Sequence, residues 1–103
     1  MEDLDKRSIT LLYLEKLLRE NNINFEREKT IKFPEELSFK NRIDFIIENK
    51  LVLELKSKRF ITTGDYLQTK KYLEILNLPL ALIVNFRQKF LKPRRILNSK
   101  ANL

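Results

Sequence analysis

Two short apolar runs with a tight polar break between them constrain the fold of this chain more than any other feature. Residues 42–48 read Arg-Ile-Asp-Phe-Ile-Ile-Glu, and residues 51–56 read Leu-Val-Leu-Glu-Leu-Lys. Both runs are rich in residues that favour strands. Glu48, Asn49 and Lys50 suit a three-residue loop, since Asn tolerates the left-handed backbone that such a loop needs. The sequence therefore predicts a β-hairpin at this point.

A helix is predicted on each side of this hairpin. Before it, apolar residues recur at helical spacing from about Ser8, the expected N-cap, to about Asn22, which ends the helix. After it, Thr63 or Asp65 is the expected cap of a second helix that continues to about Leu76. The hairpin thus lies between two helical segments of the chain.

Three further segments complete the predicted fold. Residues 23–33 alternate between apolar and polar, which predicts an edge strand that is broken by residues 34–36, Pro-Glu-Glu. The continuous apolar run of residues 80–86 predicts a buried central strand, parallel to a neighbour across the second helix. The basic tail, residues 87–103, adds a short edge element. We expect one α/β domain over residues 1–103, in the order α-β-β-β-α-β.

The absence of two residue types limits the possible chemistry. The chain has no Cys and no His. This excludes disulfides, thiolate zinc sites and any mechanism that uses an imidazole base. Any metal must be held by oxygen ligands, which favours Mg²⁺ or Mn²⁺. No apolar run is long enough for a membrane span and the acidic N-terminus is unlike a secretory signal, so the cytoplasm is the expected compartment.

The net charge of +7 is concentrated in the second half of the chain. Residues 1–55 carry a net charge of −2, whereas residues 56–103 carry +9. A basic half is the electrostatic footprint of a polyanion binder, although a solvated basic face without a partner fits equally well. The basic residues of this half that we expect to contact phosphates are Lys58, Arg59, Lys70, Lys71, Arg87, Lys89, Lys92, Arg94 and Arg95.

Asp44, Glu54 and Lys56 form the candidate catalytic centre. Glu54 and Lys56 share one face of their strand, because side chains alternate along a strand. If the hairpin loop has three residues, Ile47 pairs with Leu51 and Asp44 falls directly opposite Glu54. A two-residue loop would shift the register by one and place Asp44 on the other face.

These residue types suit phosphodiester hydrolysis. Two close carboxylates repel each other, and a divalent cation between them relieves the repulsion. Such a cation activates a water and stabilises charge on a phosphate oxygen, while Lys56 orients the water or neutralises the phosphate. The predicted metal ligands are the side chains of Asp44 and Glu54 and the backbone carbonyl of Leu55. The alternative is a solvated strand face that carries only surface ion pairs.

The order and spacing of these residues resemble the PD-(D/E)xK nuclease superfamily. Asp44 is followed, after nine residues, by the Glu-Leu-Lys of residues 54–56. Gln68 and Tyr72 resemble the Gln-x-x-x-Tyr helix of many subfamilies, and a buried strand follows that helix. The branch that the chain resembles most is that of the small GxxExxR or GxxExxY proteins.

The resemblance implies a restriction-endonuclease-like core with a mixed sheet of about four strands flanked by helices. It implies that Asp44 and Glu54 bind Mg²⁺ or Mn²⁺, that Lys56 assists the water or the phosphate, and that Gln68 reaches the site or the nucleic acid backbone. The expected activity is hydrolysis of DNA by a metal-activated water. The alternatives are a catalytically decayed nucleic-acid-binding module and a small protein-interaction subunit. Any of the three forms, the nuclease included, can be a homodimer.

The sequence departs from the family pattern at two places. Ile43 stands where the motif is named for proline. The Glu that names the GxxExxR branch aligns with Arg7, and no Gly precedes it. Glu15 is a candidate for the missing acidic ligand, but a surface carboxylate next to Arg19 is the interpretation that we favour for it.

Overall fold

The structure, a computed structural model, describes residues 6–31, 42–87 and 91–101. Two helices flank a sheet of five strands, in the order β1-β2-β3-β4-β5. The elements are α1 (Lys6–Glu20), β1 (Phe25–Thr30), β2 (Arg42–Ile47), β3 (Leu51–Lys56), α2 (Thr63–Leu76), β4 (Leu80–Asn85) and β5 (Arg94–Leu97). Strands β3 and β4 are parallel, and the other neighbours are antiparallel. The predicted α/β fold with a mixed sheet is confirmed, with five strands in place of about four.

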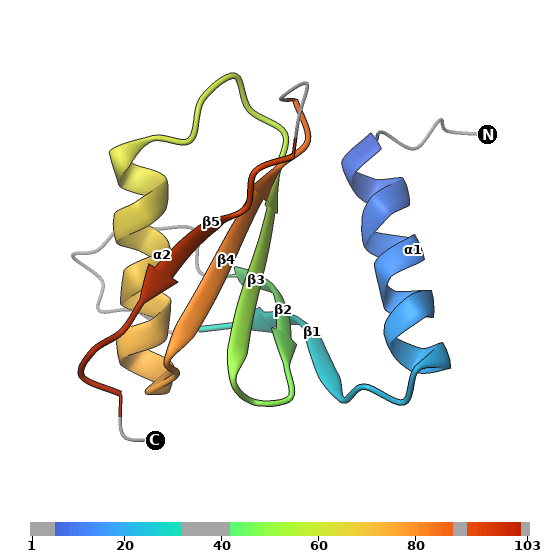
Figure 1. The fold of residues 1–103 in the computed structure, drawn as a ribbon, viewed down its shortest axis with the longest axis horizontal. Helices are drawn as coiled ribbons and strands as arrows, with labels where there is room; N and C mark the ends of the chain where they lie inside the picture. The colour runs from blue at the N-terminus through green and yellow to red at the C-terminus, as the bar shows by residue number, and fades with distance from the viewer. Residues whose placement is uncertain (1–5, 32–41, 88–90, 102–103) are drawn as a thin grey trace.

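The two helices lie on opposite sides of the sheet and divide the core into two layers (Figure 1). The layer under α1 contains the buried residues Leu11, Leu18, Phe45, Leu53 and Leu55. The layer under α2 contains the buried residues Ile31, Ile43, Ile46, Val52, Tyr72, Leu73, Leu78, Ala81, Ile83 and Ile96. None of the helices in the described ranges combines the length and the apolar character that a membrane-spanning helix needs.

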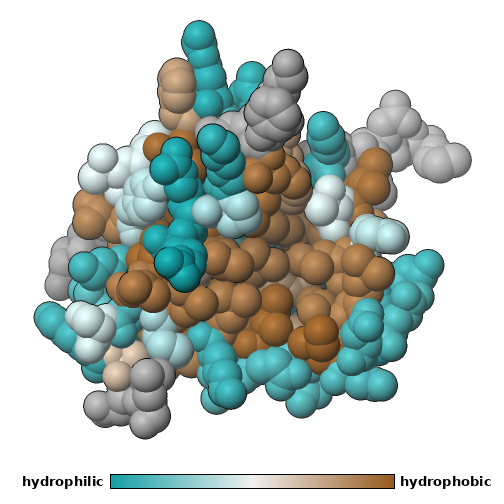
Figure 2. Space-filling model, in the orientation of Figure 1, coloured by the Kyte–Doolittle hydropathy of each residue, from teal (hydrophilic) through white to brown (hydrophobic). Residues whose placement is uncertain are grey.

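Helix α1 covers its side of the sheet only in part. On β4, Leu82 and Val84 face this side and are half-buried, whereas Ala81 and Ile83 face α2 and are buried. Leu97 of β5 is 65% exposed. Figure 2 shows a hydrophobic band across the middle of the molecule, bordered by hydrophilic residues.

The hairpin between β2 and β3 has the predicted loop and register. Glu48 and Asn49 adopt left-handed φ angles of 53° and 52°, and the Lys50 N–H donates to the Ile47 carbonyl at 3.0 Å. Ile47 then pairs with Leu51. A three-residue loop therefore sets the register on which the position of Asp44 depends.

Both helices end in a residue with a left-handed backbone. At the end of α1, Asn22 has φ 55°, and the Ile23 N–H donates back to the Leu18 carbonyl at 2.9 Å. At the end of α2, Asn77 also has φ 55°, and the Leu78 N–H donates back to Leu73 at 3.0 Å. Asn is one of the few residues that adopt this conformation at low cost. The position of each helix end is therefore determined by the residue at that position.

Several predicted boundaries need correction. Ser8 lies inside α1, which begins at Lys6. Strand β1 is an edge strand as predicted, but it is shorter than residues 23–33 because Ile23 takes part in the end of α1. Residues 34–36 lie outside the described residues. The basic tail does add an edge strand, β5.

The cap of α2 is Thr62, and neither Thr63 nor Asp65 takes that position. The Asp65 N–H donates to the Thr62 hydroxyl at 3.1 Å, and the Thr62 N–H donates to Asp65 Oδ2 at 2.8 Å. Asp65 is therefore the partner of the cap, in a reciprocal capping box. The sequence places a Thr on each side of the boundary, and only Thr62 has a carboxylate three residues later.

We predict that Phe45→Ala lowers the free energy of unfolding by about 3–5 kcal/mol, because the cavity in the α1 layer cannot collapse fully. Phe45 is fully buried, and its ring lies 5.8 Å from that of Phe25. Denaturant unfolding of the two proteins measures the difference. Phe60→Ala is the control, since Phe60 is 67% exposed and should change stability by less than about 0.5 kcal/mol. Equal losses in both variants would contradict this assignment of the core.

Candidate active site

The candidate site lies where β2 and β3 stop pairing through their backbones. The two strands pair from Ile47–Leu51 to Phe45–Leu53. At the next position in this register the Asp44 N–H donates to Glu54 Oε1 at 3.1 Å, and the Leu55 N–H donates to Asp44 Oδ2 at 2.7 Å. Two carboxylate side chains thus replace the expected backbone bonds of the ladder.

The neighbouring strand is distorted at the same level. Arg27 of β1 pairs with Phe45, and Lys29 pairs with Ile43, but Glu28 between them has a left-handed φ of 57°. Asp44 is the β2 residue opposite this distortion. A local break of this kind lets a strand redirect a side chain, which is typical of the surroundings of functional sites.

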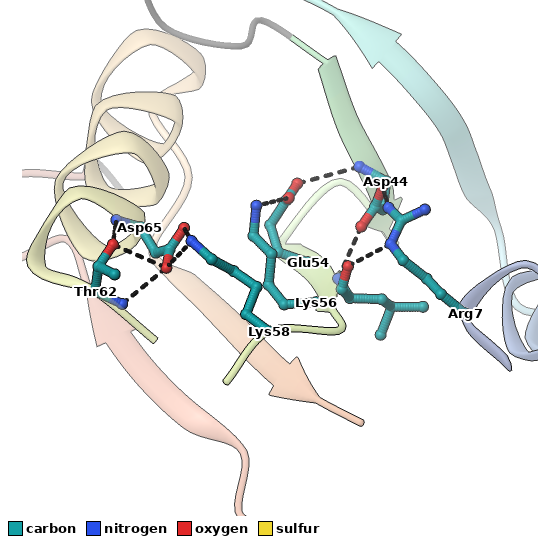
Figure 3. A network of polar contacts seen from close by, with 8 residues as sticks. Arg7, Asp44, Glu54, Lys56, Lys58, Thr62 and Asp65 are labelled. Atoms are coloured by element: carbon teal, nitrogen blue, oxygen red, sulfur yellow. Dashed lines mark hydrogen bonds and ion pairs between the residues drawn. The ribbon is translucent and has the colours of Figure 1, made fainter. Parts of the chain in front are cut away.

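Arg7, in the first turn of α1, contacts both β2 and β3. Its Nη2 donates to Asp44 Oδ1 at 2.6 Å, and its Nε donates to the Leu55 carbonyl at 2.7 Å. Figure 3 shows the guanidinium approaching Asp44 from the α1 side, while Glu54 lies on the other side of Asp44. The Asp44 side chain is 8% exposed, so this ion pair is largely shielded from water.

Lys56 lies beside Glu54, as the alternation along β3 predicts. Its Nζ is 3.9 Å from Glu54 Oε2, and the two side chains are 14% and 4% exposed. The next residues of the chain are held by Asn85 at the end of β4. Asn85 Oδ1 accepts the Lys58 N–H at 3.0 Å, and Asn85 Nδ2 donates to the Lys58 carbonyl at 2.8 Å. These two hydrogen bonds fix the path of the chain directly after Lys56.

A second ion pair lies between the end of β3 and the start of α2. Lys58 Nζ donates to both Asp65 oxygens, at 2.9 and 2.8 Å (Figure 3). Burial alone would raise the pKa of Asp65, but the hydrogen bonds from Lys58 and from Thr62 outweigh it and lower that pKa below its ordinary value. Asp65 therefore stays ionised and ties α2 to the strand that carries Glu54.

Helix α2 brings Tyr72 close to the two carboxylates. Tyr72 is 1% exposed, so its hydroxyl is buried together with its ring. Burial raises the pKa of Tyr72, and the charges of Glu54 and Asp44 raise it further. The phenol is thus a neutral group at physiological pH. Gln68 lies half-buried one turn earlier on α2, and its role in the site stays a prediction.

The sequence matches a known protein family over most of its length. A family model described as the PD-(D/E)XK nuclease superfamily matches residues 11–96. The chain belongs to the PD-(D/E)XK nuclease superfamily. Proteins of this superfamily generally hydrolyse phosphodiester bonds and typically use divalent metals. The mixed five-stranded sheet with its two helices fits a restriction-endonuclease-like fold. The finer resemblance to GxxExxR proteins stays a prediction.

A solved structure named "Crystal structure of SSO0001" has a similar fold. The TM-score is 0.61, the sequence identity is 23%, and the match covers 87% of this chain. It covers 48% of the other chain, so this PD-(D/E)XK chain spans about half the length of that protein. No curated protein matches the sequence.

The oxygen atoms of the site suit a hydrated divalent ion. Within the described ranges, no group of three or more Asp, Glu, His or Cys side chains could hold a metal. The predicted ligands, which stay a prediction, are two carboxylates and one backbone carbonyl: Asp44, Glu54 and Leu55. Asp44 Oδ1 and the Leu55 carbonyl already converge on one cationic group, the guanidinium of Arg7. Mg²⁺ binds in proteins through one or two carboxylates and several waters, so this donor set fits it.

Glu15 does not lie with these donors. It accepts from Arg19 at 2.8 Å and from Arg27 at 2.6 Å. These two partners lower the pKa of Glu15 below its ordinary value. Two turns of α1 separate Glu15 from Arg7, which is a rise of about 12 Å. The interpretation of Glu15 as a carboxylate paired with Arg19 agrees with these contacts, and Arg27 is an additional partner.

Three contacts of the site were not predicted from the sequence. They are those of Arg7 with Asp44, of Lys58 with Asp65, and of Asn85 with the backbone of Lys58. A signal existed for Asn85, because a polar residue at the end of a buried parallel strand is typical of sites in α/β folds. The Arg7 contact joins residues 37 positions apart, and no local pattern indicates it.

We predict that Asp65 makes the stability of the protein decrease at acid pH. Because folding lowers the pKa of Asp65, the contribution of its charge to the free energy of unfolding is complete above about pH 4. This contribution is lost as the pH falls through the lowered pKa. Asp65→Asn should cost about 1 kcal/mol at pH 7 and less at pH 3, measured by urea unfolding at both pH values. Glu20→Gln, at an exposed carboxylate of α1, is the control. An equal cost at both pH values would contradict the prediction.

Proposed function

We propose that this chain is a Mg²⁺- or Mn²⁺-dependent nuclease that hydrolyses phosphodiester bonds of DNA. The observation that carries the proposal is the convergence of Asp44 Oδ1 and the Leu55 carbonyl on one cationic group, with Glu54 and Lys56 next to them. Membership of the PD-(D/E)XK superfamily also supports the proposal, because its members generally hydrolyse such bonds.

The side chains divide the work between binding and positioning. Asp44, Glu54 and the Leu55 carbonyl would hold the divalent ion, which supplies a water of lowered pKa and a positive charge for the phosphate. The Lys56 ammonium lies next to Glu54 and is 14% exposed, so it can still reach a phosphate oxygen or a water. A cation in this shielded position stabilises negative charge more strongly than one in bulk water.

The surrounding contacts keep these groups in place. The Leu55 N–H fixes one oxygen of Asp44, and the Asp44 N–H fixes one oxygen of Glu54. Asn85 holds the chain after Lys56 through two backbone hydrogen bonds. Catalytic groups held by such supporting bonds need little rearrangement when a substrate binds.

Basic residues near the ends of β3 and β4 are suited to the phosphate backbone. Arg94, at the start of β5, pairs with Ile83 of β4, and Arg95 follows it. Of the basic residues that were expected to contact phosphates, Arg59, Lys70, Arg87, Lys92, Arg94 and Arg95 are exposed, whereas Lys58 and Lys71 are half-buried. Lys89 lies outside the described residues. Such contacts give affinity and salt dependence but little reading of sequence.

One contact favours the second candidate, a nucleic-acid-binding module without activity. Arg7 supplies a positive charge at Asp44 without any metal. A module of this kind would keep the basic surface and lose the cleavage. The protein-interaction subunit, the homodimer and the cytoplasmic compartment stay predictions.

A cleavage assay separates the two candidates. With Mg²⁺ or Mn²⁺, the wild type should cleave plasmid DNA, and a chelator should stop it. Asp44→Asn and Lys56→Ala should each lower the rate by about 100- to 1,000-fold. The first weakens binding of the divalent ion, and the second removes a positive charge beside the reacting phosphate. Glu74→Gln, at a partly exposed carboxylate of α2, should cleave like the wild type. No cleavage by the wild type, together with retained DNA binding, would favour the inactive module.

We predict that Arg94 and Arg95 contribute to DNA binding through phosphates. Replacing both by Gln should reduce the slope of log Kobs against log salt by about 2, since each phosphate contact contributes about 0.9. Fluorescence anisotropy with a labelled duplex, in the Asp44→Asn background, gives this slope without cleavage. Lys50→Gln, in the hairpin loop at the other end of β3, should leave the slope unchanged. An unchanged slope in the double Arg variant would remove β5 from the binding surface.

A further inference from the structure

The contacts of Arg7 coincide with the oxygens that a metal ion would need. Its Nη2 takes Asp44 Oδ1 at 2.6 Å, and its Nε takes the Leu55 carbonyl at 2.7 Å. These are two of the three protein groups that the proposed metal site offers. The Arg7 side chain is 27% exposed, so the guanidinium lies within the site and still has a path toward solvent.

A guanidinium and a divalent ion cannot share this position. The guanidinium is permanently charged, and it carries five N–H donors and no acceptor, so it cannot act as a metal ligand. A second cation on the same oxygens would repel it at short range. Asp44 Oδ1 and the Leu55 carbonyl are therefore available to a metal only when Arg7 has moved away.

We infer that Arg7 is the residue that sets the metal affinity of the site, because it occupies the metal position until a divalent ion displaces it. The inference rests on the metal site of the proposed function and does not require cleavage. If about 1–10% of molecules have Arg7 released, the apparent dissociation constant rises about 10- to 100-fold above that of an open site. Arg7 and the metal then alternate as the positive partner of a carboxylate that is almost wholly buried.

The location of Arg7 makes the displacement local. It lies in the first turn of α1, whereas the leucines that anchor this helix, Leu11 and Leu18, lie further along it. The described part of α1 before Leu11 contributes no buried residue to the core layer. Release of Arg7 therefore leaves the packing of α1 in place.

Metal titration of the purified full chain tests this inference. Mn²⁺ binding, measured by isothermal titration calorimetry, should be about 10- to 100-fold tighter for Arg7→Gln than for the wild type. Arg7→Lys should be intermediate, since one ammonium keeps the charge but lacks the fork that joins both oxygens. Arg19→Gln, at the other end of α1, should bind like the wild type. Equal or weaker binding by Arg7→Gln would overturn the inference.

A second readout does not depend on activity. Without metal, Arg7→Gln leaves Asp44 buried beside a neutral partner, so its melting temperature should be lower than that of the wild type. Mn²⁺ should raise the melting temperature of Arg7→Gln more than that of the wild type, as tighter binding to the folded state requires. If Arg7→Gln does not fold, the comparison of Arg7→Lys with the wild type decides, and equal affinity there overturns the inference.

The same titrations separate this inference from the proposed function. If the wild type cleaves DNA, Asp44→Asn loses Mn²⁺ binding and Arg7→Gln binds no more tightly, the inference fails and the nuclease stands. If Arg7→Gln binds more tightly but no variant cleaves, the inference stands and the inactive module replaces the nuclease. If no variant binds Mn²⁺, both fail.

Discussion

The buried charge of Asp44 is the constraint on which the rest of the site depends. A carboxylate removed from water costs several kcal/mol unless it is paired and hydrogen-bonded. Here one oxygen accepts the Leu55 N–H and the other accepts the Arg7 guanidinium. The first partner comes from the adjacent strand and the second from a helix on one side of the sheet. Formation of this one group of bonds therefore requires α1, β2 and β3 to be in their final places.

The opposite side of the site is built on a similar rule. Asp65 is held by Lys58 and by the cap of α2, so α2 is tied to the end of β3 through charge as well as through apolar packing. On the α1 side of the site, Arg7 neutralises Asp44. On the α2 side, Lys58 neutralises Asp65. The Glu54–Lys56 pair lies between these two ion pairs.

The sequence predicted those parts of the fold that depend on near neighbours. The hairpin register follows from loop length and from alternation along residues 51–56, and both are local properties. The end of α2 at Asn77 follows from the backbone preference of Asn. The predicted start of α1 was wrong, because Ser8 is a common cap residue but lies inside the helix, which already includes Lys6. The Arg7 contacts could not be predicted, since they depend on where α1 packs against the sheet.

The two edges of the sheet have a consequence for how copies of this protein meet in solution. An edge strand presents unpaired backbone groups to which another strand can add, and charged side chains on a short strand oppose this. Strand β5 has four residues, and its exposed Arg94 and Arg95 would face another pair of arginines if two such edges approached. At the far edge, β1 carries Glu26, Glu28 and Lys29 along its length. The arginines that suit a phosphate backbone therefore also protect the sheet from aggregation through its β5 edge.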